Sequence, residues 1–273
     1  MRWGHGRFLQ LAAWAAGGLM APALAAEPPC GPHVAALYPY APFFRELPDG
    51  GREGIDKDMF DELARRSGCE LRLVVESRVR IWEQMRNGAA GLTLSAVPTP
   101  ERQTFAEFMP YAQGRYHLMV RPDVARRIKS LEAFEADRQL TLLTVKGYAH
   151  GPTLDAALQR LRAHRRVHEV ADFPAVLRMA GAGRAHGLLA LPSAWSQVET
   201  AIGEKRAWVA LDVAPQDRAL GALALSLQMP APDRQRLRRA LQGMLADGTV
   251  ASIMHRHLGD AAARAAAYTE PAH

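Results

Sequence analysis

Residues 91–102 read GLTLSAVPTPER, an apolar run followed by the start of a helix. The run 91–97 is short and bounded by turn-forming residues, which is typical of a buried strand. Thr99 followed by Pro100 predicts a helix start, with the threonine hydroxyl as the cap and proline at the first helical position. The carboxyl end of a strand therefore meets the amino end of a helix. In open α/β sheets this junction is where ligands, and anions in particular, bind.

Strands and helices alternate on both sides of this stretch, which predicts an α/β fold with a largely parallel sheet. Asp56 is suited to cap the first helix, and Gly68 is expected to end it. The Ala-rich tail after Gly259 predicts a frayed helix or no fixed structure. Strands are expected at 33–38, 70–75, 118–120, 140–145, 167–170 and 188–191, and helices at 55–64, 80–87, 151–163, 173–182, 233–245 and 250–258.

The amino-terminal residues 1–26 predict a cleaved secretory signal. Arg2 and Arg7 precede an apolar run over 8–20, and small residues follow up to the expected cleavage after Ala25 or Ala26. The run is shorter than the roughly 20 apolar residues that span a bilayer, so we expect no stable membrane insertion. Cys30 lacks the apolar residue three positions earlier that a lipoprotein signal needs. We therefore expect a soluble periplasmic protein.

The charge of the chain argues against nucleic acid as a partner. The formal net charge is +6, and loss of Arg2 and Arg7 with the signal leaves 6 − 2 = +4. The basic residues are spread along the chain and form no block. A modest positive balance favours the approach of anionic solutes.

The two cysteines, Cys30 and Cys69, each stand at or just before the start of an expected strand. In a β-α-β unit those two starts lie side by side, so an oxidising compartment would let the cysteines pair and close a loop of about 40 residues. Two isolated buried thiols are the alternative.

Several short motifs, in their order along the chain, resemble the bacterial periplasmic solute-binding proteins of family 3, the polar amino-acid receptors of ABC importers. The motifs are 40–43 (YAPF), 54–56 (GID), 99–102 (TPER), 146–147 (KG) and 247–249 (DGT). The resemblance implies two α/β lobes with a ligand cleft between them and a hinge motion that closes it. It places the first part of lobe 1 at 27–114, lobe 2 at 115–219, the return segment of lobe 1 at 220–260 and a tail at 261–273.

The resemblance implies that two arginines reach the ligand. Arg102 matches the family's arginine that forks onto the ligand carboxylate, a contact that lysine cannot reproduce. Without an anion, a cation in the first turn of a helix opposes the helix dipole. Arg78 stands where amino-acid receptors often carry an aromatic, and a second cation there favours a ligand with a second acidic group. An exposed loop arginine is the alternative for Arg78.

Other residues match the family's cleft walls. Tyr40 and Phe43 match the aromatic wall of lobe 1, with core packing as the alternative. Ser95 and Val97 lie at the end of the strand that lines the cleft. Val97 replaces a hydroxyl residue common there, so it can offer the ligand only its backbone N–H. Three further positions follow Gly147 in the turn that offers backbone N–H groups to the carboxylate: Tyr148, Ala149 and His150. His150 is either a pH-sensitive contact or a solvated loop histidine.

Leu191 departs from the family, which usually places there the aspartate that pairs with the ligand's ammonium group. Leucine cannot neutralise an ammonium, and a buried unpaired charge costs several kcal/mol. Either another acid such as Glu199 takes this role, or the ligand has no ammonium group. We therefore expect a small anionic or amino-acid-like ligand.

Motifs of enzymes and metal sites are missing from the sequence, so we expect a binding protein without cofactor or metal. His255 and His257 are two apart and cannot share a helix face, and no HExxH, GxSxG, Walker or GxGxxG pattern occurs. A dehydratase of the same fold that acts on prephenate-like acids is the enzymatic alternative, and a ligand sensor acting in trans is another. We expect a monomer that serves an ABC permease.

Overall fold

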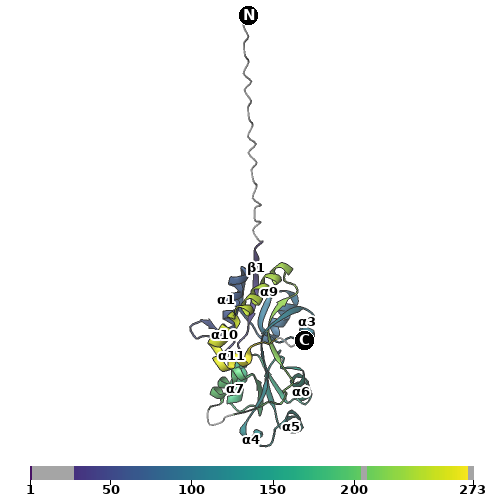
Figure 1. Cartoon of the computed structure of the whole chain (residues 1–273). Coiled ribbons are helices and arrows are strands. Elements are labelled where there is room, and N and C mark those ends of the chain that lie inside the picture. Colours follow the sequence, from purple (N-terminus) through teal and green to yellow (C-terminus); the bar gives the residue numbers. More distant parts are fainter. Residues whose placement is uncertain (2–27, 204–207, 270–273) are drawn as a thin grey trace.

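The computed structural model describes residue 1 and residues 28–203 and 208–269, and it contains two five-stranded sheets. Figure 1 shows α1, α9 and α10 around the first sheet at one end of the molecule and α4, α5 and α6 beside the second sheet at the other end. Apart from Met1, the predicted signal peptide lies outside the described residues. The predicted α/β class is confirmed.

The first sheet has the strand order β4-β1-β5-β12-β6. Strand β1 runs parallel to β4 and β5, whereas β12 runs antiparallel to β5 and β6. Its strands are β1 (Cys30–Leu37), β4 (Cys69–Val75), β5 (Leu92–Ala96), β6 (Ala106–Gly114) and β12 (Ala219–Ser226), and a small hairpin joins β2 (Arg45–Glu46) to β3 (Arg52–Glu53). The helices of this half are α1 (Ile55–Ser67), α2 (Arg78–Asn87), α3 (Pro100–Gln103), α9 (Ala231–Ala246) and α10 (Thr249–Leu258).

The second sheet has the order β11-β7-β10-β8-β9. Strands β10, β8 and β9 are parallel to one another, and β7 is antiparallel to β10 and β11. Its strands are β7 (His117–Val120), β8 (Leu142–Val145), β9 (Val167–Val170), β10 (Gly187–Ala190) and β11 (Val209–Leu211). Its helices are α4 (Pro122–Ala125), α5 (Leu131–Ala136), α6 (Pro152–Ala163), α7 (Phe173–Gly181) and α8 (Trp195–Ile202), with a 3₁₀ turn, η1, over Pro192–Ala194.

Helix α1 shows how the sequence places its elements. Its apolar side chains recur at helical spacing and are buried, and Gly68 ends it in the left-handed conformation with φ 67°. The predicted cap is wrong: Gly54, with φ 128°, precedes the helix, and Asp56 lies inside the first turn. Asp56 is buried because it faces the first sheet, where Ser95 and Tyr111 bind it.

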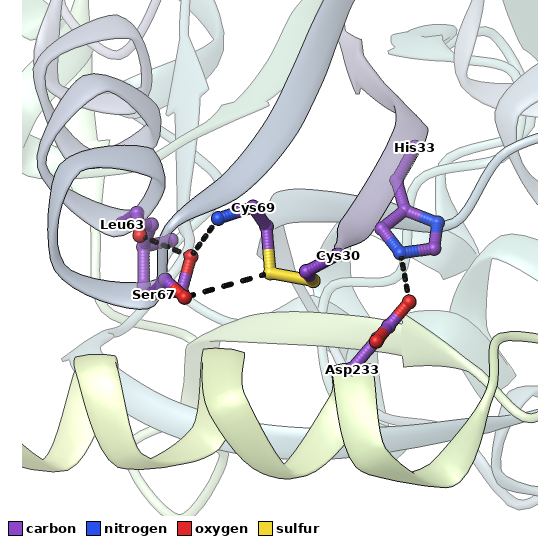
Figure 2. Close-up of a disulfide and its surroundings, with 6 residues drawn as sticks. All are labelled: Cys30, His33, Leu63, Ser67, Cys69 and Asp233. Atoms are coloured by element: carbon purple, nitrogen blue, oxygen red, sulfur yellow. Dashed lines mark hydrogen bonds and ion pairs between the residues drawn. A yellow bond between two sulfur atoms is a disulfide. The ribbon is translucent and has the colours of Figure 1, made fainter. Parts of the chain in front are cut away.

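The predicted disulfide is present between Cys30 and Cys69, which are partners in the β1–β4 ladder with Cα atoms 4.5 Å apart. Figure 2 shows the bond between the end of α1 and the face of α9. Beside it, His33 Nε2 and Asp233 Oδ2 are 2.8 Å apart, which ties β1 to the first turn of α9. These contacts hold strands and helices of the first half together at one edge of its sheet.

The chain passes between the two sheets at two neighbouring places. It leaves the first sheet after β6 and returns to it through β12, where Leu220 pairs with Gln113. Of the two expectations for the tail, a helix is present: α11 (Asp260–Ala266) packs against β6 and α10, and Ala267 forms a bridge with Ala112. The lobe boundaries stay a prediction.

Candidate ligand-binding site

Arg102 lies at the junction of β5 and α3. Thr99 caps α3 as predicted, since its hydroxyl accepts a hydrogen bond from the Arg102 backbone N–H at 3.2 Å. The Arg102 side chain turns inward, and the residue is only 8% exposed. Its Nη1 donates to the Val97 carbonyl and its Nη2 to the Gly147 carbonyl, each at 2.7 Å. Val97 follows β5 and Gly147 follows β8, so one guanidinium joins the two halves of the molecule.

Arg78 is the first residue of α2, not an exposed loop residue. It is 4% exposed, and its nitrogens donate to Thr93 Oγ1 at 3.2 Å and to the Ser95 carbonyl at 2.7 Å. Its guanidinium also lies over the Tyr38 ring, 4.0 Å from the centroid. These contacts fix Arg78 beneath the end of β5, where its charge acts on the cleft through space.

Trp82 is a residue that the sequence reasoning missed. Arg102 lies 4.1 Å and Arg78 4.8 Å from the indole, measured from each guanidinium carbon to the ring centroid. The spacing of four between Arg78 and Trp82 on a helix was the available signal. The Trp82 Nε1 atom is buried and has no hydrogen-bond partner within 28–203 and 208–269.

The two arginines make this region electropositive. Among the described residues, neither guanidinium forms an ion pair with a carboxylate, and the partners of Arg102 are neutral carbonyls. Burial, together with the charge of Arg78, lowers the pKa of Arg102 to about 10. Arg102 therefore keeps its charge at neutral pH, and an anion would relieve the cost of burying it.

Ser95 connects the end of β5 to a buried acid. Its φ of +49° is unusual for a residue other than glycine, and its backbone N–H donates to Tyr111 Oη at 3.0 Å. Its hydroxyl donates to Asp56 Oδ1 at 2.8 Å. Burial raises the pKa of Asp56 to about 7, although the hydrogen bond from Ser95, the charge of Arg78 and the hydrogen bond from Tyr111 oppose this rise.

Aromatic side chains from both halves meet in the cleft. Tyr40 stacks on Phe43, with centroids 5.5 Å apart, and meets Tyr148 and Phe173 edge to face at 5.8 and 4.9 Å. Tyr148 follows β8 and Phe173 begins α7, so the contacts cross between the halves. The Tyr148 hydroxyl is buried and has no hydrogen-bond partner among the described residues. Such groups are costly unless water or a ligand binds them.

His150 is buried, so the prediction of a solvated loop histidine is wrong. It is 2% exposed, with Nε2 3.1 Å from Thr144 Oγ1 and Nδ1 3.1 Å from Asp155 Oδ1. Its backbone N–H also donates to Asp155, an acid that the sequence reasoning missed. An acidic residue in the first turn of a helix that starts at Pro152 was the available signal. Ala149, next to His150, is buried as well.

A pocket opens beside these groups, between the two crossing strands and the cleft. Of the predicted site residues, five line it: Tyr40, Phe43, Ser95, Val97 and Leu191. Helix α11 supplies a wall through Ala262, Ala265 and Ala266. None of the described residues that line it is charged.

The other five predicted residues lie outside this pocket. Arg102 faces a groove that it shares with Trp82 and Gly147. Arg78 and Tyr148 border a small cavity next to Tyr38, and Ala149 and His150 follow in the same turn. Val97 links the two regions, because it lines the pocket while its carbonyl accepts from Arg102.

Acidic partners for an ammonium group are missing from the lining. Leu191 is half-buried and directly follows β10, at the place where the family resemblance leads us to expect an aspartate. Glu199 is exposed on α8 and does not line the pocket.

One grouping of potential metal ligands occurs among the described residues, formed by Cys30, His33 and Asp233. The Cys30 sulfur is bonded to Cys69, so it offers no thiolate (Figure 2). Without that thiolate the grouping offers a metal two ligands, and they already bind each other at 2.8 Å.

The chain belongs to the bacterial extracellular solute-binding proteins, family 3, whose model matches residues 33–260. The comparison with curated proteins found no match. No described helix combines the length and the apolar character that a membrane span needs.

Solved structures show the same fold at low sequence identity. The structure resembles a mutant of ArgBP from T. maritima, with TM-score 0.68 and 19% identity over 83% of this chain and 94% of that one. It also resembles the arginine-, lysine-, histidine-binding protein ArtJ from Geobacillus stearothermophilus, with TM-score 0.70 and 14% identity over 84% and 96%. A third is the ancestral amino acid-binding protein AncCDT-1, a precursor of cyclohexadienyl dehydratase, with TM-score 0.65 and 18% identity over 83% and 94%. The two-lobed periplasmic-binding-protein-like fold is thereby confirmed.

Proposed function

We propose that the protein is exported to the periplasm, where as a monomer it captures a small carboxylate-bearing solute between its two lobes and delivers it to an ABC permease. The ten predicted residues form or support the binding site, with Arg102 as the residue that holds the carboxylate. Membership of the solute-binding family supports the class of function.

The pair of hydrogen bonds made by Arg102 carries the proposal. A buried guanidinium that binds one neutral carbonyl from each half is a weak arrangement, because its charge is compensated only by these dipoles and by the Trp82 ring, with no carboxylate among its partners in the described part of the chain. A carboxylate accepts two parallel hydrogen bonds from such a fork and supplies the missing negative charge. We infer that Gly147 moves away when the lobes part and that the ligand carboxylate takes its place.

Arg78 serves this site indirectly. Because its donors already bind Thr93 and Ser95, we assign it to holding the end of β5 and to raising the positive potential near Arg102. This assignment replaces the expectation of a ligand with a second acidic group.

The dehydratase alternative requires a general acid that reaches the substrate. Asp56 and Asp155 already bind Ser95 and His150. Two further half-buried acids beside the cleft, Glu76 and Asp172, bind Arg80 and the backbone N–H of Ala175. We therefore favour capture over catalysis, and turnover of prephenate by the purified protein would reverse that choice. Signalling in trans needs the same capture step, so the binding test applies to both.

The test is calorimetric titration and thermal shift with a panel of small carboxylates, each paired with its amide. We expect one carboxylate to stabilise the protein by mass action and its amide to have no effect. Arg102→Ala should weaken that binding by about a hundredfold or more, because two charge-assisted hydrogen bonds are lost. Arg72→Ala is the matched control, since Arg72 is an exposed arginine of β4 paired with Glu70. Equal binding by Arg102→Ala and Arg72→Ala would overturn the proposal.

A further inference from the structure

The pocket beside Arg102 defines the ligand more closely than the guanidinium does. This inference rests on the proposed function, because it takes the carboxylate at Arg102 as its starting point. Val97 lies between the two: its carbonyl is 2.7 Å from Arg102 Nη1, and the residue also lines the pocket. We place the carboxylate of the ligand at Arg102 and its body past Val97 in the pocket.

The lining cannot neutralise a cation. Its side chains are aromatic, aliphatic or neutral polar, and Leu191 stands at the carboxyl end of β10 facing Gly114 of β6. Asp56 lies behind Ser95 and accepts from it and from Tyr111 through the same oxygen, Oδ1. Burial raises the pKa of Asp56 to about 7, although these two hydrogen bonds favour its charged form. An ammonium group in the pocket would be buried without a counter-charge, which is strongly unfavourable.

The size of the pocket restricts the body of the ligand. Its volume is about 100 Å³, and one side of it is open to solvent. An engineered cavity of roughly 150 Å³ holds benzene, so this pocket suits a smaller group such as a branched chain of three or four carbons. The alanines of α11 set this limit, because a larger side chain at Ala262 or Ala266 would occupy the space.

We propose that the ligand is a monocarboxylate without an ammonium group, whose short branched aliphatic body packs against Val97, Leu191 and the alanine face of α11. Apolar burial in the pocket and the fork of Arg102 then supply the affinity. The pocket disfavours amino acids because it offers no counter-charge to their ammonium group, and not because they overlap with its walls.

The test compares three ligands that share one carbon skeleton: 4-methylpentanoate, 4-methyl-2-oxopentanoate and leucine, by calorimetric titration of the full mature protein. We expect at least one of the two ammonium-free acids to bind about a hundredfold or more tightly than leucine, the penalty of an unpaired buried charge. Leu191→Asp should reverse this order, because it supplies the counter-charge. Leu191→Asn is the matched neutral variant and should not favour leucine.

Two variants of α11 test where the aliphatic body lies. Ala266→Leu fills the pocket and should weaken the ammonium-free acids at least about tenfold, whereas Ala261→Leu, at an exposed position of the same helix outside the lining, should leave them unchanged. Equal effects of the two variants would overturn the placement.

The outcomes separate this inference from the proposed function. Tighter binding of leucine or another amino acid that still depends on Arg102 would overturn the ligand class and leave the carboxylate receptor standing. Binding that is insensitive to Arg102→Ala, or no binding by any carboxylate of the panel, would overturn both.

Discussion

Replacing Asp56 by asparagine tests the buried network beneath the cleft. Asp56 is 1% exposed, and the hydroxyls of Ser95 and Tyr111 both approach its Oδ1, at 2.8 and 3.3 Å. Asparagine keeps an acceptor oxygen for both hydroxyls but cannot ionise. The substitution therefore removes the titration of this position and retains its hydrogen bonds.

The size of the effect follows from the pKa of Asp56, which is about 7 in the folded protein against an ordinary value of 3.8. Between these two pH values the folded protein holds a proton that the unfolded chain has released. Stability of the wild type must therefore fall as the pH rises through this window and level off above pH 7. The loss amounts to about 4 kcal/mol, because each pKa unit corresponds to about 1.4 kcal/mol.

The assay is urea unfolding of wild type and Asp56→Asn at intervals from pH 4 to pH 8, followed by tryptophan fluorescence and circular dichroism. The free-energy difference between the two proteins should shift by about 4 kcal/mol in favour of the variant across this range. Neighbouring hydrogen bonds lower the pKa values of Glu62 and Asp247 to about 2. These groups titrate equally in both proteins, so their contributions cancel in the free-energy difference. A difference that does not change with pH would refute the assignment of a neutral buried acid.

Two further predictions concern stability. The double replacement Cys30→Ala and Cys69→Ala should cost about 4 kcal/mol in urea unfolding, because the bond closes a loop with a sequence separation of 39; a loss below about 1 kcal/mol would contradict this account. Gly54→Ala should cost about 3 kcal/mol or more, since the backbone has φ +128° and the new Cβ would overlap the Phe43 carbonyl. Its control is Gly50→Ala, where φ is also positive but nothing lies within 4 Å, so only a smaller backbone cost of about 1 to 2 kcal/mol is expected. Equal losses in the two glycine variants would refute the steric part of the argument.

The fold was largely predictable because its signals are local. The apolar spacing of α1, the glycine at its end and the Thr99-Pro100 start of α3 each act within a few residues and occur as expected. The cap of α1 was mispredicted because an acid at a helix start also suits a buried position, and here Ser95, 39 residues away, binds Asp56. The packing partners of helix α11 were not foreseen, because an alanine-rich segment is ordered only by what it packs on, in this case β6 and α10.

The candidate site was predictable in its positions and less so in its contacts. The strand-to-helix junction located Arg102 correctly at the first turn of α3. The partners of its guanidinium could not be foreseen, because Gly147 is 45 residues distant and approaches only when the two sheets come together. The contact between Arg102 and Trp82 also joins residues from separate elements, whereas the Arg78–Trp82 and His150–Asp155 contacts are local and their spacing was an available signal.

The sequence by itself determined the class of the protein: the alternation of strands and helices, the paired cysteines and the anion-binding junction depend on residue spacing alone. Tertiary structure decided which residues share the pocket. Leu191, Val97 and the alanines of α11 come from segments far apart in the chain, and only their packing places them around one pocket whose described lining carries no charge. The proposal of a ligand without an ammonium group rests on this packing, since a charge that costs little in water becomes expensive once water is removed.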